Sequence, residues 1–150
     1  MARAIQLAIE NVRSNSGGPF GAVVVKDGAI IAEGTNRVTA TNDPTAHAEV
    51  VAIREACVRL SLFELRGCEV FTSCEPCPMC LGAIYWARPL RVYFGSTAAD
   101  AARIGFDDSL IYSEIQQPHS ERKIPMVQIM GAEALEAFRA WLDQPDRRPY

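Results

Sequence analysis

Two short segments of the chain hold side chains that can bind a metal ion and move protons. The first contains His47 and Glu49, two residues apart. The second is P-C-P-M-C (76–80), in which Cys77 and Cys80 are three residues apart and therefore share one face of a helix that begins there. Two thiolates and one imidazole suit Zn²⁺ and leave its fourth position open for water. The sequence therefore predicts a zinc site made of His47, Cys77 and Cys80.

Glu49 is the candidate proton carrier of this site. Zinc lowers the pKa of a bound water to about 7, which makes hydroxide available at neutral pH. Attack on an amino-substituted ring carbon then needs a group that protonates the ring nitrogen and afterwards the departing amine. A carboxylate beside the metal can do both, and H-x-E with P-C-x-x-C is the signature of zinc-dependent deaminases. The combination predicts hydrolytic removal of an exocyclic amino group from a nucleobase-like heterocycle.

Other interpretations of these residues stay open. Cys74 could join the three ligands in a closed, structural zinc site. Three cysteines at successive three-residue spacings, with prolines between them, converge awkwardly, and a closed site would leave Glu49 without a task. Taken alone, His47 could serve as a capping or core histidine, and Glu49 as a carboxylate stabilised by a helix dipole. We therefore expect an open site in which Cys74 is not a ligand.

The composition limits the class of protein. The chain has 150 residues and is 49% hydrophobic, which suits one compact domain. Its net charge of −3 disfavours nucleic acid as a substrate. No apolar run is long enough to span a bilayer, so we expect no membrane partner. The five cysteines are an odd number, which argues against a disulfide framework. Cys57 is expected to pack in the core, and Cys68 has no partner at motif spacing.

The N-terminal segment predicts an amphipathic helix. Its apolar residues recur at Ile5, Ala8, Ile9 and Val12, with charged residues on the other faces. A signal peptide would instead have an unbroken apolar centre. We therefore expect a cytoplasmic protein.

The elements that would position the site alternate along the chain. Two apolar runs, 21–25 and 29–32, flank Asp27-Gly28 and predict a β-hairpin. A helix is expected to follow, with Asn42 or Asp43 as its cap and Pro44 near its first position. The remaining expected strands cover 69–73, 91–95 and 126–130, and the remaining expected helices cover 78–87, 97–104, 109–116 and a last helix around 134–142. This order predicts an α/β fold, a mixed sheet with helices on both faces.

Four stretches of the chain carry a resemblance to a known family: GGPFGAVVVKDG (17–28), NDPTAHAEVVAIREAC (42–57), TSCEPCPMCLGAIYWARP (72–89) and GFDDSLIY (105–112). Together they resemble the small, Bacillus-type bacterial guanine deaminases of the cytidine deaminase superfamily. The H-A-E and P-C-x-x-C pieces are common to the superfamily. The stretch GFDDSLIY and the terminal Tyr150 are more specific to this branch.

The resemblance implies a fold and an activity. The fold would be a three-layer αβα cytidine-deaminase-like domain with a central mixed sheet, spanning residues 1–150. The activity would be hydrolysis of guanine to xanthine and ammonia in purine catabolism or salvage, with one zinc ion per subunit. Zinc hydroxide would attack C2 while Glu49 carries the protons. The C-terminal segment, about residues 131–150, would be exchanged between the subunits of a homodimer.

The resemblance also implies the residues that contact the base. Asn36 would hydrogen-bond it, and Phe20 would form an apolar wall, with Trp86 a second one. Asp108 would accept hydrogen bonds from ring N–H groups, and Tyr150 would reach the base from the C-terminal tail. His47, Cys77, Cys80 and Glu49 keep the roles that their chemistry predicts.

Without the resemblance, the substrate contacts have simpler interpretations. Asn36 could serve a turn, Phe20 could be a core residue, and Tyr150 could be a frayed terminus. Asp107 and Asp108 could be a solvated pair or a helix cap.

Three other functions compete with a guanine deaminase. A tRNA adenosine deaminase shares the zinc motif but normally has a basic surface, and the sequence pI here is about 5.4. A guanosine or cytosine deaminase would differ in the depth of its pocket. A non-catalytic, zinc-stabilised binding module is the alternative from a different class.

Overall fold

The computed structural model describes residues 1–150, and the contacts of the chain divide it into two units. Unit 1 is Met1–Ser109 and unit 2 is Leu110–Tyr150, and each is described by itself. The expectation of one domain over residues 1–150 therefore stays a prediction. None of the helices combines the length and the apolar character that a membrane span requires.

Unit 1 is built on a four-stranded mixed sheet. The strands are β1 (Gly21–Lys26), β2 (Ala29–Thr35), β3 (Cys68–Cys74) and β4 (Arg91–Ser96), in the order β2-β1-β3-β4. β1 is antiparallel to β2 and to β3, whereas β3 and β4 are parallel. The turn between β1 and β2 has positive φ at Asp27 (50°) and Gly28 (78°), as a type I′ turn requires. The predicted hairpin is confirmed.

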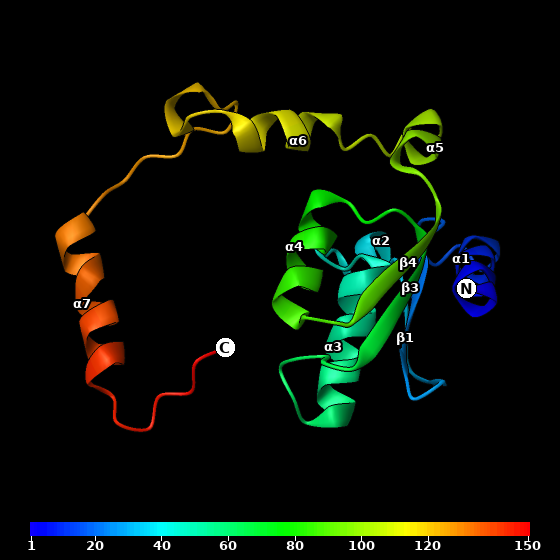
Figure 1. Cartoon of the computed structure of the whole chain (residues 1–150). Helices are drawn as coiled ribbons and strands as arrows, with labels where there is room; N and C mark the ends of the chain where they lie inside the picture. The colour runs from blue at the N-terminus through cyan, green and yellow to red at the C-terminus, as the bar shows by residue number, and fades with distance from the viewer. The chain divides into compact units, whose positions relative to one another are not determined.

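Helices cover both faces of this sheet. α1 (Ala2–Arg13) lies on one face, and α3 (Ala48–Leu60) and α4 (Pro78–Ala87) lie on the other (Figure 1). The two shorter helices of the unit are α2 (Val38–Thr41) and α5 (Ala98–Arg103). The main core cluster is formed by the following buried residues of the sheet, of α3 and α4, and of the connections between them: Ala22, Val24, Ala32, Ala48, Ala52, Ile53, Ala56, Leu65, Cys68, Val70, Ile84 and Ala87. The predicted layered α/β architecture is confirmed.

The buried face of α1 differs from the predicted stripe. The buried residues of α1 are Ala4, Leu7, Ala8 and Asn11. The predicted helix is confirmed, but Ile5, Ile9 and Val12 of its apolar stripe are 42%, 45% and 50% exposed. The close approach of the sheet explains the difference, because a Cβ at Gly21 would lie only 2.4 Å from the carbonyl oxygen of Ala4. The face of α1 that carries Ala4, Leu7 and Ala8 therefore packs against the strand, and Ile5, Ile9 and Val12 lie outside.

α3 begins later than the sequence pattern predicts. The expected start at Pro44 is wrong, because the first helical residue is Ala48 and His47 is the N-cap. Asp43 forms a turn instead of a cap. Its Oδ1 accepts hydrogen bonds from the backbone N–H and the hydroxyl of Thr45, at 2.8 and 2.7 Å. Short polar side chains commonly make this local alternative to a helix.

Unit 2 contains helical elements and no buried side chain. Its elements are α6 (Ser109–Gln116, which begins at the last residue of unit 1), the 3₁₀ turn η1 (His119–Glu121) and α7 (Gly131–Asp143). The strand expected over 126–130 is wrong: this segment has no strand structure and pairs with no other strand. A strand needs a neighbour to satisfy its backbone groups, and apolar composition alone does not supply one. The large apolar residues of the unit are exposed, among them Ile115, Val127, Ile129, Phe138, Trp141 and Leu142.

Replacing Gly34 by Ala is expected to destabilise unit 1. A Cβ at Gly34 in β2 would lie 2.2 Å from the carbonyl oxygen of Ala48 and 2.6 Å from the backbone nitrogen of Ala52. Overpacking of this kind costs about 1–3 kcal/mol. Urea unfolding of Gly34→Ala should show this loss in the free energy of unfolding.

Gly82→Ala is the matched control for this prediction. Gly82 lies inside α4, and a Cβ there would meet nothing within 4 Å. Ala in place of a helical Gly stabilises by about 0.5–1 kcal/mol, so this variant should be at least as stable as the parent. Equal stability of the two variants would contradict the close approach of α3 to β2.

Candidate functional site

Two helix N-termini meet at the site. His47 is the N-cap of α3 (φ −70°, ψ 155°), and Cys77 is the N-cap of α4 (φ −65°, ψ 167°). Both caps have extended backbone, so their side chains lie beyond the ends of the helices. Cys80 follows one turn into α4, after a proline at the first helical position. His47 and Glu49 would diverge on a continuous helix, and they come together here because His47 precedes α3.

The three predicted ligands lie together. The Nδ1 atom of His47 is 3.5 Å from the Sγ of Cys77 and 3.5 Å from the Sγ of Cys80. The ligating atoms of the three residues all lie within 4.8 Å of one another. Zn–S and Zn–N bonds of about 2.3 and 2.0 Å in a tetrahedron place ligand atoms about 3.5–3.8 Å apart. The donor set and its spacing therefore fit a zinc ion.

The protonation of the cluster also favours a cation. A hydrogen bond with the Cys80 side chain, together with His47 and the backbone N–H of Cys80, holds the pKa of Cys77 well below its usual range. The same hydrogen bond, with burial, raises the pKa of Cys80. The hydrogen bond to Cys77 raises the pKa of His47. A thiolate at a helix N-terminus, beside a second thiol and an imidazole, is a suitable anionic site for a divalent ion.

Glu49 is buried beside this cluster. Its Oε2 lies 3.4 Å from the Sγ of Cys80, and its Oε1 accepts a hydrogen bond of 3.2 Å from the hydroxyl of Thr72. Burial raises the pKa of the Glu49 carboxyl, so the group holds a proton more readily than an exposed glutamate does. One carboxylate oxygen therefore faces the ligands while the other is held by the strand.

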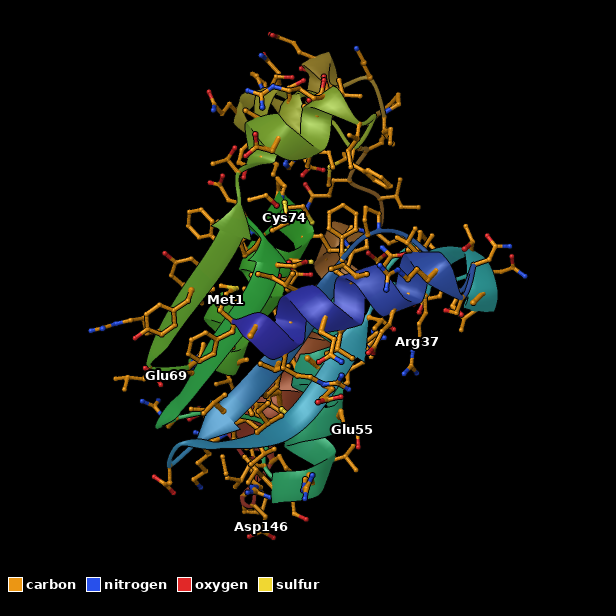
Figure 2. All side chains as sticks on the ribbon, turned by 90° about the vertical axis from the view of Figure 1, so that its right-hand side faces the viewer. Met1, Arg37, Glu55, Glu69, Cys74 and Asp146 are labelled. Carbon is orange, nitrogen blue, oxygen red and sulfur yellow. The ribbon has the colours of Figure 1, made fainter.

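Cys74 lies apart from the ligand set. It is buried at the end of β3, opposite the end that carries Glu69 (Figure 2). Its thiol donates to the carbonyl oxygen of Thr97 at 3.7 Å, and the group of metal-ligating atoms does not include it. Cys57 packs against the core and Cys68 lies within it. The geometry therefore supports the open, three-ligand site.

Asn36 belongs to a segment that is hydrogen-bonded to the segment preceding α3. The backbone N–H of Arg37 donates to the carbonyl oxygen of Ala46 at 2.9 Å, which brings Asn36 and His47, each one residue away, close together. Asn36 is buried, and its Oδ1 accepts from the backbone N–H groups of Val38 (3.3 Å) and Gly18 (3.4 Å). The amide NH₂ group is thus the part of Asn36 that can donate to a ligand.

The segment after α5 adds an aromatic and a carboxylate. Phe106 packs edge-on against Phe20, with ring centroids 4.9 Å apart. Asp107 is exposed and accepts from the backbone N–H of Ser109 at 2.9 Å, so it forms a local turn just before α6. Asp108 is half-buried, and burial and the Cys77 thiolate raise the pKa of its carboxyl while His47 opposes them. Asp108 therefore belongs to the electrostatic environment of the ligands.

Two predicted contacts are not brought to the cluster in this way. Trp86 lies on α4 and is 64% exposed. Tyr150 is the last residue of unit 2, whereas the cluster belongs to unit 1. The roles of both residues stay predictions.

Two buried polar residues escaped the sequence analysis. Asn11 donates through its Nδ2 to the carbonyl oxygens of Gly18 and Asn36, both at 2.9 Å. Thr72 donates to Glu49. Asn11 lies on the buried, otherwise apolar face of a helix, and Thr72 lies at a buried alternate position of a strand. A polar residue within such an apolar pattern is the sequence signal that could have identified them.

Comparison with known proteins gives the family of this chain. Residues 1–96 match the family model of the cytidine and deoxycytidylate deaminase zinc-binding region. The chain belongs to this family. It is 57% identical over 150 residues to the guanine deaminase of Bacillus subtilis, covering 100% of this chain and 96% of that protein. The X-ray structure of a Bacillus subtilis guanine deaminase superposes with a TM-score of 0.97 at 58% identity, covering 99% of this chain and 95% of that one.

More distant relatives share parts of the chain. A solved structure in complex with 2,6-diaminopurine has a TM-score of 0.68 at 36% identity, covering 71% of this chain and 60% of that one. The tRNA-specific adenosine deaminase of Aquifex aeolicus is 47% identical over 78 residues, covering 52% of each protein. The similarity to the tRNA enzyme is thus restricted to about half of the chain.

Substitution of the cysteines should separate ligand from neighbour. We expect Cys77→Ser and Cys80→Ser to lose most of their bound zinc, because each removes one of three protein ligands. Cys74→Ser should keep equimolar zinc, since its thiol contacts a carbonyl oxygen instead. Metal analysis of each variant after gel filtration is the measurement. Loss of zinc from Cys74→Ser would restore the closed, structural site.

Proposed function

We propose that this protein hydrolyses guanine to xanthine and ammonia. The observation that carries the proposal is the contact of Glu49 with the His47, Cys77 and Cys80 cluster. The match to a guanine deaminase over the whole chain supports guanine as the substrate. A structure that binds 2,6-diaminopurine supports a pocket for purines that carry an amino group.

His47, Cys77 and Cys80 would hold one zinc ion in each subunit. Bound there, zinc lowers the pKa of a coordinated water, which supplies hydroxide near neutral pH. The two thiolates compensate the charge of the ion, and the N-terminus of α4 stabilises them in that state.

Glu49 would move the protons of the reaction. It accepts a proton from the water whose oxygen bonds to C2, and it gives this proton to the adjacent ring nitrogen. It then transfers the second proton of the water to the exocyclic amine, and the C2–N bond breaks to release ammonia. One water is consumed, and the carboxylate is regenerated. The raised pKa of Glu49 suits a group that must both take and return a proton.

Recognition of the base would come from the residues around Asn36. The NH₂ group of Asn36 can donate to an acceptor on the purine, because its Oδ1 is already occupied by backbone N–H groups. The carboxylate of Asp108 can accept from ring N–H groups. Phe20, supported by Phe106, would form the apolar wall, with Trp86 as a second wall.

Ammonia release from a panel of substrates tests the proposal. The panel contains guanine, guanosine, adenine, cytosine and a tRNA anticodon stem-loop. We expect guanine to be preferred by about 100-fold or more, since shape and apolar contact alone supply about 10²-fold discrimination and hydrogen bonds to the base add to it. Preference for the stem-loop would contradict the substrate and leave the zinc site intact.

Glu49→Ala is the control for the chemistry in this test. The variant should keep its zinc and its fold but lose at least about 100-fold in kcat, since a positioned acid–base group supplies about 10²–10⁴-fold. Unchanged ammonia release from this variant would remove Glu49 from the proton path.

We further propose a homodimer in which the C-terminal segment, about residues 131–150, is exchanged between subunits. The exposed apolar side chains of unit 2 support this, because such a surface is normally covered. The resemblance to guanine deaminases implies that the covering surface belongs to a second copy. Tyr150 would then complete the partner's pocket.

The five free cysteines fit the reducing cytoplasm, where we place the enzyme.

Complementation between two inactive chains tests the exchange. One chain carries Glu49→Ala, and the other ends at Arg147 and so lacks Tyr150. After co-expression, a swapped heterodimer has one site with both residues, so activity should recover to about a quarter of that of the parent. Each chain alone should stay inactive. A tail that folds back on its own subunit would give no recovery, and an active truncated chain would exclude a role for Tyr150.

A further inference from the structure

Buried polar side chains are few in this protein, and each belongs to the surroundings of the site. They are Asn11, Asn36, Glu49 and Thr72. Thr72 is 1% exposed and its hydroxyl donates to Oε1 of Glu49 at 3.2 Å. Each of the four has a hydrogen-bond partner, since no buried side-chain nitrogen or oxygen lacks one.

The position of Thr72 does not require a hydroxyl for packing. β3 alternates strictly, and Cys68, Val70, Thr72 and Cys74 are the buried residues of the strand. The other three are apolar or thiol side chains. Val has nearly the same shape as Thr and a similar preference for strands, and it would bury no hydroxyl. The hydroxyl is therefore explained by its partner Glu49 and not by the core.

Glu49 reaches the site from a different element. It lies in the first turn of α3, whereas Thr72 lies on β3, so the hydrogen bond fixes the carboxylate relative to the sheet. Oε2 faces Cys80 at 3.4 Å while Oε1 is held at 3.2 Å. With one oxygen held, the carboxylate keeps the orientation in which the other faces the ligands. A buried carboxylate without this bond would turn about its last side-chain torsion, which is broad.

We propose that Thr72 is a positioning residue for the reaction, whose hydroxyl orients the carboxylate of Glu49 toward the water and the base. The inference rests on the proposed deaminase function. Thr72 touches neither substrate nor metal in this role. Its effect is confined to the rate of proton transfer, because the ligands and the base-contacting residues do not depend on it.

Kinetics of Thr72→Val and Thr72→Ser test the proposal. Thr72→Val should lower kcat for guanine about 10- to 100-fold, the usual cost of losing a bond that orients a functional group. KM and zinc content should stay close to those of the parent. Thr72→Ser keeps the hydroxyl and should stay within about threefold of the parent in kcat, because the donor to Oε1 is retained.

Three results with these variants would overturn the proposal. They are an unchanged kcat in Thr72→Val, an equal loss in Thr72→Ser, and a loss of zinc or a raised KM that accounts for the lower activity. If Thr72→Val does not fold, Thr72→Ala removes the same hydroxyl and repeats the comparison with Thr72→Ser.

A double-mutant cycle in urea unfolding gives a readout that needs no substrate. The zinc-loaded variants are Thr72→Val, Glu49→Met and the double mutant, and neither replacement side chain can form the original bond. Direct coupling should change the unfolding equilibrium constant by about threefold or more beyond additivity. Additive effects would overturn the contact. If the parent releases no ammonia from guanine, the proposed function fails, whereas a coupled pair in the cycle would still stand.

Discussion

The structure depends on one geometric constraint, which is that two thiols and an imidazole must lie within the bonding distances of a single cation. These groups come from the starts of two helices, with His47 ahead of α3 and Cys77 and Cys80 at the start of α4. Both helices must therefore lie on the same face of the sheet and begin at the same end of it. Because the bound ion would contact both helix starts, its binding energy would stabilise the fold as well as the site.

Close packing of small residues makes that constraint achievable. Gly21 brings α1 against β1, and Gly34 brings α3 against β2, with backbone atoms of the helix within 2.4 Å and 2.2 Å of the position a Cβ would take. Helices that contact a strand through backbone atoms have little freedom to shift, since interiors are close-packed. The position of His47 is thus set by the sheet, and the precision that a metal site needs is supplied by residues without side-chain chemistry.

Local signals in the sequence predict some of these features, and tertiary packing decides the others. Asp27-Gly28 predicts its hairpin because a type I′ turn needs positive φ at both positions, and the prolines around Cys77 predict the start of α4. The buried face of α1 could not be predicted from its aliphatic residues, because the close approach at Gly21 selects the face that carries Ala4 and Ala8. The contact of Thr72 with Glu49 joins a strand to a helix 23 residues away, and a periodic pattern carries no information about such a partner.

The residues that we propose for the chemistry and those that we propose for binding the base lie in different parts of the chain. The first group must be held rigidly, whereas the second can vary. The ligands and Glu49 lie at helix starts, where a shift of one residue would break the site. Two of the polar base contacts that we propose lie outside regular elements: Asn36 follows β2, and Asp108 follows α5. Loops can change without moving the scaffold, so one metal site can serve several substrates. The sequence match to the tRNA-specific adenosine deaminase of Aquifex aeolicus covers 78 residues, whereas that to a guanine deaminase extends over all 150.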